Sequence, residues 1–230
     1  MKYVYLVFAF LVCNNLMLFA QKTISNVSIT YELKMDKDNP AASMLNGTTM
    51  TLSFKEFKSK SNISVMGGMM NMDMIADAKD KKGLMLMAIP MMGKNVAVEM
   101  NADEMNQNQD NSVKPEITYD KKSKKKIEGF LCYKAIVKTS LSGEPLIFYV
   151  TDKIKPNASS QIQNQVPGLN GFPLAFEINQ MGLKLTMEAV KIDKSLPSDD
   201  QFEMKIPDGF EKITMDEFKQ MGGGLGSFGL

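Results

Sequence analysis

The sequence predicts a mainly β protein, in which a curved antiparallel sheet with a few short α-helices forms an open half-barrel. Apolar and polar residues alternate with period two along about ten segments, which is typical of strands with one buried face. Signals for helices are few and short, so little helical material is available as a second layer over the apolar face. A sheet without such a layer curls or keeps an apolar concavity, and a concavity of this kind marks a binding site.

The clearest hairpin lies between residues 126 and 154. Alternate residues from Leu131 to Val137 are expected on one face of its first strand, because side chains alternate along a strand. Ser142 and Gly143 supply the turn, and Phe148 lies on one face of the return strand.

The other elements follow from the same alternation and from helix-capping signals. Two short helices are predicted after capping boxes, in which Ser160 pairs with Gln163 and Thr214 with Glu217. A short helix is also expected at 41–45, and the lysine-rich run at 121–126 is interpreted as a solvated turn. Further strands are predicted at 27–35, 50–55, 57–66, 70–76, 84–89, 96–100, 116–119, 172–178 and 183–189, with an edge strand at 201–205.

The first twenty residues have the pattern of a secretory signal peptide. Lys2 precedes a short apolar run, and the small residue Ala20 marks the expected cleavage site. Cys13 suggests lipid attachment as an alternative, but the preceding Val12 is larger than lipid-attaching enzymes usually accept. We expect a signal peptide at 1–20, a single β domain at 21–221 and a flexible Gly-rich tail at 222–230, in a protein of the periplasm or the extracellular space.

The composition argues against catalysis and against nucleic-acid binding. The chain contains no histidine, arginine or tryptophan, so the usual general base and the forked donor that reads guanine are both missing. Without Lys2, 26 basic residues (27 − 1) balance 26 acidic residues. One cysteine, Cys132, remains after the leader, so neither a disulfide nor a thiolate metal site is expected. We predict a protein that is not an enzyme and uses no cofactor and no metal.

Methionine is the unusual feature of the composition. The chain has 21 methionines, and eleven of them lie between Met66 and Met105. Thioethers bind Cu(I), so a copper site within 66–92 is one interpretation. Methionine is also a pliant apolar side chain, and its spacing here follows strand alternation, which favours lining of a core or pocket.

Three segments of the second half resemble a known family: KIEGFLCYK at 126–134, FYVTDKI at 148–154 and GLNGFPL at 168–174, with IPDGF at 206–210 as its last element. The family comprises secreted Gram-negative proteins of unknown function, related to those named for a Gly-Leu-Pro-Gly-Leu-Ile motif. It is similar in turn to the periplasmic lipoprotein carrier and its outer-membrane receptor, the LolA/LolB-like fold. The resemblance implies a curved half-barrel with a few helices across its mouth and no catalysis. The carrier's arginine has no counterpart here.

These observations predict a non-enzymatic periplasmic or secreted module that binds an acyl chain or another apolar ligand in the concavity of the sheet. The expected partner is a lipid or a lipoprotein acyl chain, with peripheral contact with the envelope and none with nucleic acid. A Met-rich Cu(I)-binding protein and a protein-interaction domain without a small ligand are the alternatives. The expected ligand-lining residues are Met70, Met72, Met74, Met85, Met87, Phe148 and Phe176.

Overall fold

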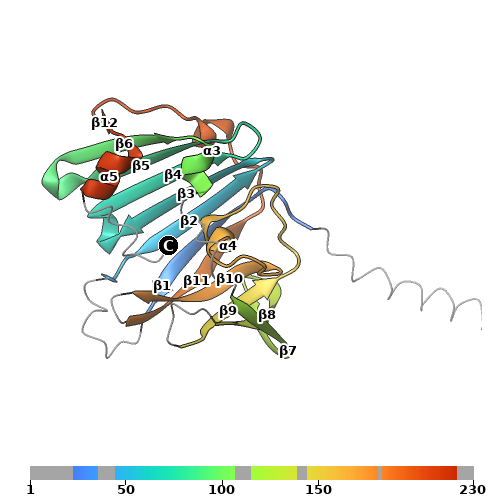
Figure 1. The fold of residues 1–230 in the computed structure, drawn as a ribbon. Helices are drawn as coiled ribbons and strands as arrows, with labels where there is room; N and C mark the ends of the chain where they lie inside the picture. Colours follow the sequence, from blue (N-terminus) through green and yellow to red (C-terminus); the bar gives the residue numbers. More distant parts are fainter. Residues whose placement is uncertain (1–22, 36–44, 107–114, 139–143, 181–182, 222–230) are drawn as a thin grey trace, which may run out of the picture.

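The computed structural model describes residues 23–35, 45–106, 115–138, 144–180 and 183–221 (Figure 1). The predicted signal peptide, the helix at 41–45 except Leu45, the hairpin turn at Ser142 and Gly143 and the tail at 222–230 lie outside these residues.

Within the described residues, twelve strands form one sheet in the order β12-β6-β5-β4-β3-β2-β1-β11-β10-β9-β8-β7. All neighbours are antiparallel except β12, which runs parallel to β6. The strands are β1 (Val27–Lys34), β2 (Thr49–Lys55), β3 (Lys58–Val65), β4 (Met70–Asp77), β5 (Lys82–Ile89), β6 (Lys94–Met100), β7 (Glu116–Ile127), β8 (Phe130–Lys138), β9 (Leu146–Thr151), β10 (Phe172–Gln180), β11 (Leu183–Asp193) and β12 (Glu211–Lys212).

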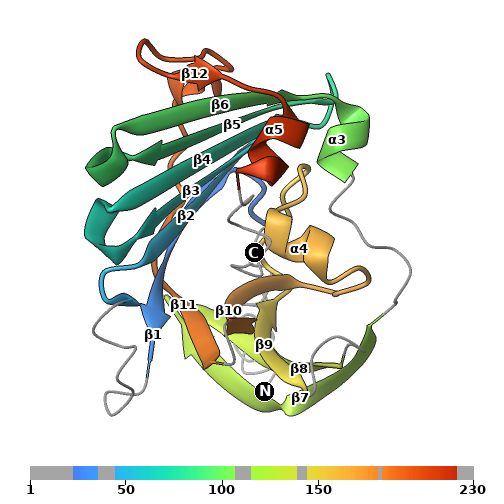
Figure 2. The same ribbon diagram turned by 60° about the vertical axis from the view of Figure 1, so that its left-hand side comes forward.

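The sheet curves strongly, and three short helices lie on its concave side (Figure 2). They are α3 (Ala102–Asn106), α4 (Gln161–Gln165) and α5 (Met215–Gln220). Ile162 of α4 and Phe218 of α5 are buried in the core of the sheet, and Met105 of α3 packs against that core. The predicted capping boxes are both present, because Ser160 and Thr214 each accept a bond from the backbone three residues later.

The convex side of β2 and β3 is covered by the segment that follows β11. This segment contains the single turn η4 (Asp199–Phe202), which contacts β3 and buries Phe202. Asp199 Oδ1 lies 2.8 Å from Nζ of Lys55, at the end of β2. The segment then adds β12 to the edge of the sheet, next to β6.

The predicted fold class is confirmed: the chain is mainly β, with a curved antiparallel sheet that forms an open half-barrel and short helices on the concave side. This is the architecture that the resemblance implied. The edge strand predicted at 201–205 is wrong, because this segment forms η4 and an extended connection, and the edge is made by β12.

One detail of the β7–β8 hairpin also differs from prediction. The lysine run is part of the continuous strand β7, although the ladder shifts between Asp120 and Lys124, where a bulge takes the place of the expected turn. Leu131 is 58% exposed, whereas Cys132 is buried. The bulge bends the hairpin and changes which side of its tip is covered. Leu131 is therefore exposed, although it shares a face of β8 with Ala135 and Val137.

Candidate functional site

One face of the sheet is apolar across eleven of the described strands, and we call it the inner face. Side chains directly opposite each other in an antiparallel ladder point to the same side of a sheet. The ladder registers therefore place two connected rows on the inner face. The first row is Val96, Met87, Met72, Ile63, Met50 and Tyr31. The second row continues from Leu33, beside Tyr31, to Met187, Phe176, Phe148, Ala135 and Tyr119.

The register thus brings all seven expected ligand-lining residues onto this one face. Five of them are the methionines of β4 and β5, and strands β3 to β6 are called the methionine wing below. Met72, Met85 and Met87 are buried there, whereas Met70 and Met74 are half-buried. A ligand can therefore touch Met70 and Met74 directly but must displace neighbouring side chains to reach the other three.

The other two candidates belong to strands β8 to β10, called the aromatic wing. Phe148 stacks on Phe176 with ring centroids 6.0 Å apart. Tyr31 meets Phe176 edge to face at 5.7 Å, and its hydroxyl donates to the carbonyl of Pro173 at 2.8 Å. These contacts fix the rings, so Phe148 and Phe176 form a rigid floor at this part of the inner face.

One end of the inner face is covered by helices and turns. The helices α3 and α4 follow β6 and precede β10 at this end. A Cβ atom on Gly83 would lie 2.9 Å from Cε of Met100 and 3.2 Å from Sδ of Met105, so a larger residue at this position would displace the ends of these flexible side chains where α3 packs against the sheet. Near the same end, Ile24 forms a parallel bridge with Ile154, which is buried.

The opposite end of the inner face, where β1, β3, β5, β8 and β10 end, stays partly exposed, and we call it the exposed end. Six half-buried apolar side chains from six different strands lie on the inner face there: Leu33, Met70, Ile89, Ile117, Leu146 and Ile178. The turns at this end include η2 (Met66–Gly68) and η3 (Pro90–Met92). Met69, Met91 and Met92 beside or within these turns are 45%, 76% and 63% exposed.

Ser61 of β3 is a functional candidate that the sequence did not single out. The register places it on the inner face between Leu52 of β2 and Met74 of β4. Its side chain is buried, with 6% of the residue exposed, and among the described residues Oγ has no hydrogen-bond partner. The other buried polar side chains of the described residues are all bonded: Ser53 to Ser28, Thr151 to the backbone of Lys153, and Ser160 to Gln163.

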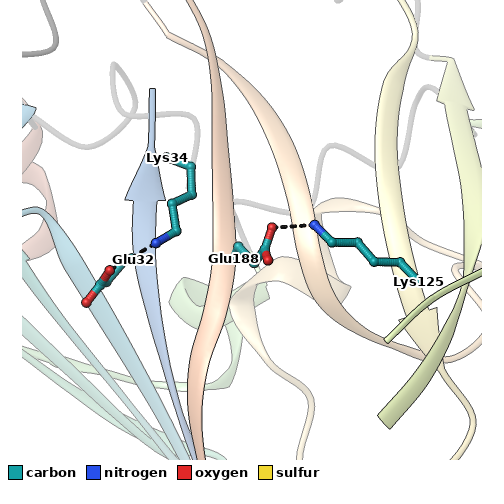
Figure 3. A network of polar contacts seen from close by, with 4 residues as sticks. All are labelled: Glu32, Lys34, Lys125 and Glu188. Carbon is teal, nitrogen blue, oxygen red and sulfur yellow. Dashed lines mark hydrogen bonds and ion pairs between the residues drawn. The ribbon is translucent and has the colours of Figure 1, made fainter. Parts of the chain in front are cut away.

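Charged groups gather on the outer face. Glu32 and Glu188 lie directly opposite each other on β1 and β11, an arrangement that repels unless cations compensate it. Figure 3 shows the two compensating lysines: Lys34 Nζ lies 3.1 Å from Glu32, and Lys125 Nζ lies 2.6 Å from Glu188. These carboxylates are thus neutralised in pairs and point away from the inner face.

The nucleophilic and phenolic groups of the core are held in their neutral forms. Burial raises the pKa of the Cys132 thiol to about 12, against a weaker opposing effect of Lys125. Burial also raises the pKa of Tyr31 well above its usual value. A thiol without its thiolate form is a poor nucleophile, so Cys132 acts as a small apolar side chain in the core.

The described residues offer neither a cluster of metal ligands nor a membrane-spanning helix. No group of three or more histidine, cysteine, aspartate or glutamate side chains is arranged to hold a metal ion there. The helices formed by the described residues are also too short to cross a membrane.

No protein-family model matches the chain, and no curated protein matches it. Several solved structures are similar at a distance. A structure of MucB in complex with MucA shares 10% identity with a TM-score of 0.42, over 83% of this chain and 57% of MucB. A Pseudomonas aeruginosa MucA/MucB complex shares 9% with a TM-score of 0.41, over 83% and 58%. The Mycobacterium tuberculosis lipoprotein LppX shares 8% with a TM-score of 0.39, over 76% and 90%.

The chain thus spans less than three fifths of the length of the MucB chains that it matches. At these identities and TM-scores no residue role follows from the matches.

Proposed function

We propose that this protein is a non-enzymatic binding module of the periplasm or the extracellular space, which holds an acyl chain or another apolar ligand along its inner face. The observation that carries the proposal is the difference between the two ends of that face. One end is covered by α3 and α4, whereas six apolar side chains from six strands remain half-buried at the other. A ligand that enters at the exposed end gains contact with apolar surface that the protein alone leaves partly in water.

The free energy available from such contact is sufficient to bind a lipid. One buried methylene contributes about 0.8 kcal/mol, so a sixteen-carbon chain gains about 12 kcal/mol before the costs of association. The helices α3, α4 and α5 have five, five and six residues. Helices of that length are about 8–9 Å long, much shorter than a strand of eight residues, which is about 26 Å long.

The methionine wing suits a ligand of variable shape. Met70 and Met74 are half-buried, and each has a flexible thioether side chain that adapts to its neighbour. Side chains of this kind let one site accept acyl chains of different length or unsaturation. The rigid rings of Phe148 and Phe176 then support the same ligand from the other wing.

A binding assay with two matched variants tests the proposal. Purified protein is titrated with a neutral fluorescent acyl-ester probe, and bound lipid is sought by solvent extraction and mass spectrometry. We expect Met70→Lys, which places a charge at the exposed end, to weaken probe binding at least tenfold. Leu131→Lys, which changes an exposed side chain of the β7–β8 hairpin, should leave binding unchanged. Absence of both extractable lipid and probe binding would overturn the proposal.

A Cu(I) site remains the second candidate, and a specific observation supports it. Met69, Met91 and Met92 are exposed near two turns at the same end of the sheet, where their thioethers are accessible to a soft ion. Anaerobic titration with Cu(I) should give one equivalent of binding that is lost in the variant with Met91→Leu and Met92→Leu. Titration without binding would remove this candidate and leave the lipid proposal untouched.

A further inference from the structure

Ser61 is the described buried polar side chain that has no hydrogen-bond partner, and it lies on the face to which we assign the ligand. Cross-strand neighbours of Ser61 are Leu52 and Met74, which offer neither a donor nor a strong acceptor. An unpaired buried hydroxyl is unfavourable, since it has lost its bonds to water without replacement. Among the described residues, no group on the inner face forms a hydrogen bond that would account for a serine at this position.

We infer that Ser61 Oγ binds a neutral oxygen of the ligand, such as an ester carbonyl or a hydroxyl, and that the protein takes neutral acyl esters or alcohols. This inference rests on the proposed function. A partner oxygen from the ligand completes the hydrogen bond that the protein leaves open. Met74, half-buried and directly opposite Ser61, has a flexible side chain that can move aside when the chain enters.

The charge around Ser61 decides between a neutral and an ionised ligand group. The described inner-face residues of β2, β3 and β4 include no lysine, since Lys55 and Lys60 point to the outer face, where they pair with Asp199 and Asp73. A free carboxylate beside Ser61 would be buried without a counter-charge, which is strongly unfavourable. The site therefore selects an ester or alcohol against a free fatty acid.

The position of Ser61 also sets how deep the oxygen lies. Ser61 is four residues from Val65, the last residue of β3 at the exposed end. At about 3.3 Å per residue, the hydroxyl lies about 13 Å inside the inner face. The bound oxygen therefore lies on the inner face away from the exposed end, and an apolar part of the ligand extends from it toward the exposed end.

Displacement of diphenylhexatriene, a neutral hydrocarbon probe, tests this selectivity. The competitors are methyl palmitate, palmitate and hexadecane, which share a sixteen-carbon chain and differ in their polar group. For the wild-type protein we expect methyl palmitate to compete about tenfold more strongly than hexadecane, and palmitate at neutral pH to compete most weakly. Ser61→Ala should remove the advantage of the ester and leave hexadecane unchanged.

Two serine controls separate recognition from folding. Ser59→Ala changes a serine on the same face two residues away, and the preference for the ester should remain. Ser53→Ala removes a hydroxyl bonded to Ser28 at 2.8 Å on the outer face, so its Tm should fall, whereas the Tm of Ser61→Ala should be unchanged or higher.

The outcomes distinguish the inference from the proposed function. If diphenylhexatriene binds and all three competitors displace it equally from both proteins, the binding module stands and the role of Ser61 is overturned. If the ester advantage persists in Ser61→Ala, the role of Ser61 is likewise overturned. If neither the probe nor any competitor binds, the proposed function fails, and this inference fails with it.

Discussion

The two wings of the sheet share one apolar face but fill it with different chemistry. The methionine wing presents flexible thioether side chains, of which Met70 and Met74 are half-buried. On the aromatic wing, Phe148 stacks on Phe176 at 6.0 Å, and Tyr31 of β1 meets Phe176 edge to face at 5.7 Å. Methionine adapts to its surroundings at little energetic cost, whereas stacked rings have few alternative arrangements.

This difference assigns the two wings different parts in the molecule. We expect the aromatic wing to contribute most to the stability of the curved sheet, and under the proposed function the methionine wing is the part that adapts to a ligand. Changes in the aromatic wing should therefore be seen first in unfolding, and changes in the methionine wing first in binding. The following predictions test this division.

The largest effect is expected from truncation of the central ring. Phe176→Ala removes the side chain that touches both Phe148 and Tyr31, and it should lower the free energy of unfolding by about 3–5 kcal/mol. Met74→Ala truncates a half-buried, flexible side chain of the other wing and should cost no more than about 2 kcal/mol. Urea unfolding measures both. Equal losses in the two variants would contradict the division between the wings.

The second prediction concerns alkaline pH and the buried thiol of Cys132. Its pKa is about 12 in the folded protein and near 9 when exposed. Between these values the unfolded chain loses its proton first, so stability falls as pH rises above 9, by up to about 1.4 kcal/mol per pH unit. Urea unfolding at pH 8.5 and pH 10 should show a smaller loss for Cys132→Ala than for the wild type. Parallel losses in the two proteins would show that the thiol is not held neutral.

A smaller effect is expected at the loop before β10. The hydroxyl of Tyr119 accepts a hydrogen bond from the backbone N–H of Asn170 at 2.7 Å, and the ring of Tyr119 lies edge to face against Tyr133. Tyr119→Phe keeps the ring contact and removes the bond, so stability should fall by about 0.5–1.5 kcal/mol. Hydrogen exchange of the Asn170 amide should become faster. Unchanged exchange would mean that the hydroxyl does not hold this loop.

The smallest effect is expected at the outer ion pair between Lys125 and Glu188. The two groups are partly exposed, so Lys125→Met should cost no more than about 1 kcal/mol, and high salt should reduce the difference. Lys34→Met, in the neighbouring pair with Glu32, serves as the matched control on the same face. A loss of several kcal/mol that does not depend on salt would contradict a surface role for the pair.

Much of the fold followed from local patterns in the sequence. Period-two alternation located the strands of the methionine wing, and the capping boxes at Ser160 and Thr214 located α4 and α5. Alternation also indicates that Ser61 shares a face with Ile63. Whether its hydroxyl finds a partner depends on Leu52 and Met74, which are contributed by other strands.

The errors have the same origin in non-local contacts. Alternation places Leu131 on one face with Ala135 and Val137, but it does not reveal the bulge between Asp120 and Lys124, which bends the hairpin and leaves Leu131 exposed. The segment at 201–205 alternates like a strand, yet Phe202 is buried in η4 against the sheet. A sequence pattern specifies which side chains share a face, and the pairing of distant strands decides what covers that face.

Native mass spectrometry of the protein isolated from the envelope fraction of its own cells tests the central claim most directly. We predict a population carrying one non-covalent adduct with the mass of a neutral acyl lipid, which is lost in Met70→Lys and retained in Leu131→Lys. Detection of the protein only at the mass of its polypeptide would contradict the claim that the inner face holds the ligand. An adduct that persists in Met70→Lys, which carries a charge at the exposed end, would contradict it too.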